Sequence, residues 1–152
     1  MKKKNSGFTL IELVVVITIL GILAAFALPR FAALQTEARI SKMNGALAAL
    51  KTGAALAHSI QLTQQLAANT SVIMEGSTVP MVNGYPTTAL TGIPIAAGLT
   101  TPDYVLTVTS ATVFRVSADA NHPNCAVTYT VPAAAGSPPT YVVTGLTAVN
   151  CA

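Results

Sequence analysis

The sequence predicts an α+β fold, in which a long N-terminal helix carries a small antiparallel sheet of about four strands. Three observations predict this fold. A basic start is followed by an unbroken apolar run, residues 40–57 repeat apolar side chains at helical spacing, and from residue 104 Val and Tyr alternate with Thr or Ser. We expect the apolar half of the helix to protrude and its amphipathic half to pack on the sheet. The 152 residues allow one compact domain plus an extension.

Composition and charge exclude a basic nucleic-acid-binding face. Apolar residues make up 52% of the chain and charged residues 9%, well below the roughly 25% charged residues of soluble domains. The net charge of +3 comes from Lys2, Lys3 and Lys4, since without them 8 − 3 = 5 basic side chains face 5 acidic ones. We therefore predict no direct binding of nucleic acid.

The first element is an apolar helix over residues 8–28, long enough to span a bilayer. At about 1.5 Å per residue its length is roughly 30 Å, the thickness of the hydrocarbon core. The preceding lysines would keep the N-terminus in the cytoplasm. Glu12 is the one charge in this segment, and an unpaired carboxylate inside a bilayer costs about 2.5 kcal/mol or more.

Three interpretations of this segment compete. A secretory signal peptide would use Ala25-Phe26-Ala27 as its cleavage site, but its apolar region would be long and would contain a carboxylate. A plain membrane anchor leaves Glu12 unexplained. The third interpretation rests on the motif Gly7-Phe8-Thr9-Leu10-Ile11-Glu12-Leu13 itself, together with the lysine-bearing leader and Pro29.

This motif resembles the class III signal sequence of the type IV pilin family. The resemblance is strong over roughly the first 60 residues and extends to the rest only in general layout; it is closest to a type IVa-like major pilin. It implies that a prepilin peptidase cuts between Gly7 and Phe8 and that the same enzyme N-methylates the new amine of Phe8. It also implies that Glu12 pairs with the Phe8 amine of a neighbouring subunit during assembly. In the family the stretch from Gly21 to Pro29 can lose helicity in filaments, and we expect a kink at Pro29.

Beyond Pro29 the helix is predicted to continue to about residue 67. Apolar side chains recur every three or four residues, which is typical of an amphipathic helix. Glycines interrupt this half at Gly45 and Gly53, and we interpret both as close-packing positions. The apolar stripe consists of Ile40, Met43, Leu47, Leu50, Ala54 and Ala57.

The remaining elements form the head. Residues 68–102 are predicted to be a connecting loop, because turn signals such as Glu75-Gly76 and Asn83-Gly84 recur there. Its best candidates for regular structure are residues 71–74 and 95–99. Alternation of Val or Tyr with Thr or Ser predicts strands at 104–109, 112–118, 126–131 and 140–144. Within the connection, residues 79–86 loosely resemble mannose-sensitive haemagglutinin-type pilins.

Cys125 and Cys151 are the two cysteines. An exported chain meets an oxidising compartment, so a disulfide is the first expectation, and in pilins such a pair bounds the C-terminal variable region. Closing this loop would contribute roughly 3 to 4 kcal/mol in the chain-entropy model. The alternative is a zinc site that adds His122 to the cysteines, with His58 the other histidine. We expect no metal, no cofactor and no enzymatic activity, since no catalytic constellation stands out.

These observations predict three parts: a cleaved leader at residues 1–7, a transmembrane and polymerisation half at 8–30, and a globular head at 31–152. The resemblance implies a pilus subunit, made as a single-pass inner-membrane precursor and assembled into an extracellular filament for adhesion, surface motility or DNA uptake. Its implied partners are further copies of the chain, the prepilin peptidase, minor pilins and an inner-membrane assembly platform. The alternatives are a type II secretion pseudopilin or minor pilin, and a secreted binding domain behind an ordinary signal peptide.

Overall fold

The computed structural model describes residues 8–152, and within them the dominant element is helix α1, Leu10–Thr63. By internal contacts the chain divides into two units after Gln35, and each is described separately. The N-terminal unit, as far as it is described, consists of the first part of α1. The second unit is the head, residues 36–152, which contains the rest of α1 and every strand of the described chain.

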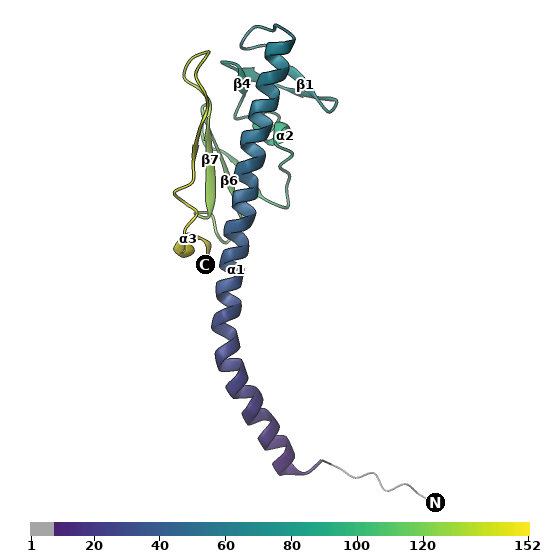
Figure 1. The fold of residues 1–152 in the computed structure, drawn as a ribbon, viewed down its shortest axis with the longest axis vertical. Helices are drawn as coiled ribbons and strands as arrows, with labels where there is room; N and C mark the ends of the chain where they lie inside the picture. The colour runs from purple at the N-terminus through teal and green to yellow at the C-terminus, as the bar shows by residue number, and fades with distance from the viewer. Residues whose placement is uncertain (1–7) are drawn as a thin grey trace, which may run out of the picture. The chain divides into compact units, whose positions relative to one another are not determined.

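The head contains a four-stranded antiparallel sheet along the C-terminal half of α1 (Figure 1). The strand order follows the chain, and neighbouring strands pair in register, as in Arg115 opposite Thr128. Each strand lies inside a range predicted from the sequence, so the α+β prediction is confirmed. The strands are β5 (Val105–Val108), β6 (Val113–Ser117), β7 (Ala126–Thr130) and β8 (Thr140–Val142).

One face of this sheet packs on the predicted apolar stripe of the helix. Met43, Leu50 and Ala54 are buried there, and they share a core with Phe114 and Tyr129 of the sheet. The stripe includes Ala46 and Gly53, two small residues that the spacing alone did not assign to it. Burying both apolar faces against each other removes them from water, which is the main stabilising contribution in a domain of this size.

The connection between helix and sheet carries more regular structure than the predicted loop at 68–102. It forms two short hairpins and one helical turn: β1 (Val72–Met74) with β2 (Ser77–Val79), β3 (Met81–Val82) with β4 (Tyr85–Pro86), and α2 (Ile93–Ala96). Both hairpins turn through two residues in the left-handed region, Glu75-Gly76 and Asn83-Gly84, the geometry that suits two-residue hairpin loops. Of the two regular pieces expected here, residues 71–74 contain β1 and residues 95–99 overlap the end of α2, whereas β2, β3 and β4 were not expected.

Helix α1 also ends earlier than predicted, at Thr63 and not near residue 67. Gln65 takes a left-handed conformation with φ 52°. The amide of Leu66 donates to the Gln61 carbonyl at 3.0 Å and that of Gln65 to the Leu62 carbonyl at 3.1 Å. This pattern is a Schellman cap, which satisfies the last carbonyls of a helix and reverses the chain. Glycine usually holds the left-handed position, so glutamine gave no sequence signal.

Candidate functional site

The start of α1 is closed by a reciprocal cap between Thr9 and Glu12. The Thr9 amide and hydroxyl both donate to Glu12 Oε2, at 2.9 and 2.6 Å, and the Glu12 amide donates to the Thr9 hydroxyl at 3.3 Å. This arrangement is a capping box, in which two unpaired amides at a helix start are satisfied together. A role was predicted for Glu12 but not for Thr9, although the spacing Thr-x-x-Glu before an apolar run is the signal for a capping box.

The capping box uses only one of the two carboxylate oxygens of Glu12. Both local hydrogen bonds end on Oε2, and over residues 8–152 no described group donates to Oε1. Glu12 is also exposed, as is Phe8 beside it. The carboxylate is thus held at a fixed place on the helix, and its second oxygen has no partner among residues 8–152. Gly7, the predicted residue before the cleavage point, lies outside the described residues.

The helix around Glu12 exposes a continuous apolar surface. Every residue from 8 to 35 is exposed, including Leu10 at 80%, Phe26 at 75% and Leu28 at 68%. By length and composition α1 is apolar enough to cross a membrane. A surface of this kind is far larger than the apolar patches that monomeric soluble proteins carry, so this part of the helix requires a bilayer or other apolar helices around it.

Gly21 and Pro29 both lie inside the helix. The α-helical conformation continues through each of them in the single chain. Proline has no amide hydrogen, so Pro29 leaves the Ala25 carbonyl without its helical donor. The kink and the loss of helicity in filaments stay predictions.

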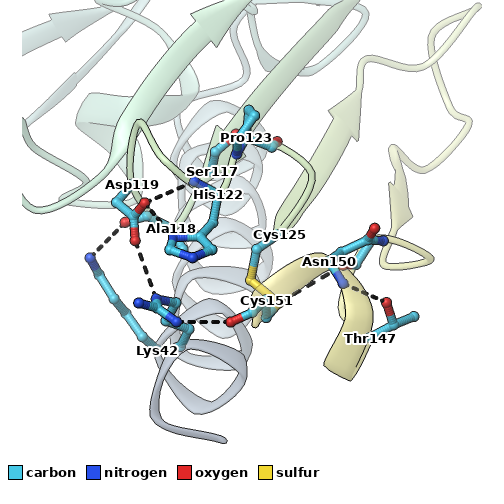
Figure 2. Close-up of a disulfide and its surroundings, with 12 residues drawn as sticks. Lys42, Ser117, Ala118, Asp119, His122, Pro123, Cys125, Thr147, Asn150 and Cys151 are labelled. Atoms are coloured by element: carbon cyan, nitrogen blue, oxygen red, sulfur yellow. Dashed lines mark hydrogen bonds and ion pairs between the residues drawn. A yellow bond between two sulfur atoms is a disulfide. The ribbon is translucent and has the colours of Figure 1, made fainter. Parts of the chain in front are cut away.

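In the head, Cys125 and Cys151 form the expected disulfide (Figure 2). Both residues are fully buried, and the bond joins Cys125, the residue before β7, to the C-terminal helix α3, Ala148–Cys151. Two further contacts hold α3: Arg39 donates to the Cys151 carbonyl at 3.0 Å, and the Thr147 hydroxyl caps the helix start. Because both sulfurs are bonded to each other, neither is free to ligate zinc in this structure.

The two histidines have structural contacts. The Nδ1 atom of His122 lies 2.7 Å from Asp119 Oδ1, and the other Asp119 oxygen lies 3.4 Å from Arg39 Nε. Partial burial raises the pKa of Asp119, but hydrogen bonds from the His122 side chain and the His122 and Asn121 amides outweigh it, so the pKa lies below its ordinary value. His58 stacks on Tyr85 with ring centroids 4.3 Å apart.

Comparisons with known proteins point to one family. Residues 2–28 match the model of the prokaryotic N-terminal methylation motif. The chain is 49% identical over 49 residues to the type IV major pilin protein PilA of Myxococcus xanthus, covering 32% of this chain and 22% of that protein. It is 50% identical over 48 residues to the type IV major alpha-pilin of Moraxella bovis, covering 32% and 30%.

A third relative is the type IV narrow pilus major component PilA5 of Thermus thermophilus, 47% identical over 54 residues that cover 36% of this chain and 47% of that protein. The chain thus spans less than half the length of each of these relatives. No solved structure matches it significantly. The N-terminal third of the chain thus carries the methylation motif and is similar to the same part of several type IV pilins.

Proposed function

We propose that this protein is the subunit of a type IV pilus, which polymerises through the N-terminal part of α1. The observation that carries the proposal is the exposed apolar surface of residues 8–35, which contains one carboxylate already fixed by the helix cap. In the precursor this surface would lie in the inner membrane. In the filament it would be covered by the same segment of neighbouring copies, so no apolar surface is left in water.

Glu12 would set the register of these copies. Cleavage between Gly7 and Phe8 creates a positively charged amine at Phe8, and methylation keeps that charge. The free Oε1 atom of Glu12 would accept a hydrogen bond from the Phe8 amine of a neighbour, while Oε2 keeps its contacts with Thr9. In an apolar bundle an unpaired charge is strongly disfavoured, so axial shifts that separate the amine from the carboxylate are excluded.

The proposal includes the path from membrane to surface. A prepilin peptidase would remove residues 1–7 and methylate Phe8, and an inner-membrane platform with minor pilins would assemble the mature subunits. The finished filament would be extracellular and would serve adhesion, surface motility or DNA uptake. The disulfide between Cys125 and Cys151 suits this location, since it forms and persists in oxidising surroundings.

Electron microscopy and mass spectrometry of surface material test the proposal. Filaments sheared from cells that express the chain should consist mainly of it, and a strain that lacks the gene should yield no such filaments. Recovery of the protein only from the cell envelope, with the sheared fraction unchanged in the deletion strain, would overturn the proposal.

A further inference from the structure

The face of the sheet opposite the helix contains a groove of about 420 Å³. All of its lining residues belong to the head. Hydroxyl, amide and small apolar side chains line it, with a single guanidinium among them. The lining residues are Thr109, Val113, Arg115, Asn124, Ala126, Thr128, Val142, Thr144, Gly145 and Asn150.

Strand register forms the floor of the groove. Arg115, Thr128 and Val142 stand opposite one another across β6, β7 and β8, and their side chains share a face because alternate residues of a strand point to opposite sides. Their neighbours Phe114 and Tyr129 point the other way, into the core. The floor is therefore rigid, because the core on its far side fixes the three strands.

The C-terminal segment before α3 forms a wall. Gly145 lies directly against β7, since a Cβ atom there would come within 2.6 Å of the Asn124 carbonyl oxygen and 2.8 Å of that of Ala126. The disulfide at Cys151 holds the end of this segment. The groove is thus a product of the disulfide-bounded region and not an isolated dent in the sheet.

Arg115 is fixed in the groove but keeps free donors. Its Nη2 atom donates to the Pro123 carbonyl and lies 3.4 Å from Asn124 Oδ1. Over residues 8–152 no acceptor is recorded for Nη1 or Nε, and no carboxylate belongs to the described lining. A positioned guanidinium with unused donors is well suited to a carboxylate, which it binds through two parallel hydrogen bonds.

We propose that this groove binds an acidic saccharide, with the sugar carboxylate on Arg115. The Thr128 and Thr144 hydroxyls and the Asn124 and Asn150 amides offer donors and acceptors for sugar hydroxyls, and the valine methyl groups suit the apolar side of a sugar ring. Nucleic acid fits poorly, because phosphate backbones are bound by several cations at once and this lining offers one. The inference concerns the single chain and does not depend on filament assembly.

Calorimetric titration of the full-length chain in nonionic detergent tests the inference, with sialyllactose as the probe and lactose as its neutral counterpart. Sialyllactose should bind and lactose should bind much more weakly. Arg115→Gln should weaken sialyllactose binding by roughly tenfold or more, as expected for a lost hydrogen bond to a charged group. Lys51→Gln makes the same charge change outside the groove, where Lys51 lies over the Tyr141 ring, and should leave the affinity unchanged.

A second variant keeps the test decisive if Arg115→Gln does not fold. Thr128→Val removes one hydroxyl of the floor but keeps the shape and strand preference of the side chain, so it should weaken sialyllactose binding severalfold in a folded head. Equal affinity for lactose, an equal loss in Lys51→Gln, or unchanged affinity in Thr128→Val would overturn the inference. Binding of a short DNA duplex but not of sialyllactose would overturn it as well.

Discussion

Two glycines of α1 give a matched pair for testing how the helix packs in the head. Gly53 is buried where α1 meets α2, and a Cβ atom there would come within 2.4 Å of the Ala96 carbonyl oxygen and 2.7 Å of the Ala97 nitrogen. Gly45 lies two turns earlier on the same helix and is exposed, with nothing within 4 Å of an added Cβ. Changing each to alanine adds the same methyl group to the same helix.

The two changes should affect stability differently. In a helix interior alanine is favoured over glycine by about 1 kcal/mol, so Gly45→Ala should raise the free energy of unfolding by about that amount. Gly53→Ala gains the same term but forces the backbone of α2 away, because ordinary carbon contacts begin near 3.4 Å. Overpacking of this kind costs typically 1–3 kcal/mol. Gly53→Ala should therefore unfold about 1–3 kcal/mol more easily than Gly45→Ala.

Thermal unfolding followed by near-ultraviolet circular dichroism measures this difference. The chain has four tyrosines and no tryptophan, and Tyr85, Tyr104, Tyr129 and Tyr141 all lie in the head, so the tyrosine signal reports the head alone. At roughly 4 °C per kcal/mol for a domain of this size, the midpoint of Gly53→Ala should lie about 4–12 °C below that of Gly45→Ala. An equal or higher midpoint for Gly53→Ala would refute the close approach of α1 and α2.

Further perturbations probe three features: the disulfide, the helix start and the contacts of Asp119 with His122 and Arg39. The double change Cys125→Ala and Cys151→Ala opens a loop with a sequence separation of 26 and should lower the free energy of unfolding by about 3.5 kcal/mol in the chain-entropy model; in urea titrations an unchanged midpoint would contradict this. Glu12→Gln keeps a capping side chain for Thr9 but removes the charge, so leader processing should continue while filament yield falls to background. Thr9→Val is the matched control, because it removes the capping hydroxyl but keeps the Glu12 charge, and filaments should still form. Normal filament yield from Glu12→Gln would refute the pairing of Glu12 with the Phe8 amine of a neighbouring copy. Asp119→Asn should make the free energy of unfolding fall less steeply at acid pH. Because the pKa of Asp119 is lowered in the folded chain, its ionised form stabilises the fold above its ordinary pKa near 4, and this stabilisation is lost as the pH falls through the lowered pKa. If the urea midpoint of Asp119→Asn falls with decreasing pH as steeply as that of the wild type, Asp119 does not make this contribution.

The sheet and the helix could be predicted because their patterns are long. Strands β6 and β7 are five residues long and alternate over four of them. The stripe from Met43 to Ala57 repeats over about four turns of helix. Hairpins β1–β2 and β3–β4 could not be found in this way, because strands of two or three residues are too short to show alternation. Their turn residues were visible, and Asn83-Gly84 is the dipeptide most typical of a hairpin.

Some residues of the candidate site could be predicted from the sequence and others could not. Glu12 could be singled out because a charge in an apolar run is costly, and the cysteine pair because the chain is expected to be exported. Thr9 was not predicted, because its role depends on the same glutamate, whose charge in an apolar run already suggested a different role. The groove around Arg115 could not be foreseen, since it depends on strand register and on the approach of Gly145 to β7, which are tertiary features with no local pattern.

The mass and N-terminal sequence of the mature protein test the central claim most directly. If the chain is processed and assembled as a pilin, the mature protein begins at N-methylated Phe8 and contains 152 − 7 = 145 residues. A mature chain that begins near Leu28, after Ala25-Phe26-Ala27, would have lost Glu12 and the apolar segment, and would contradict the account.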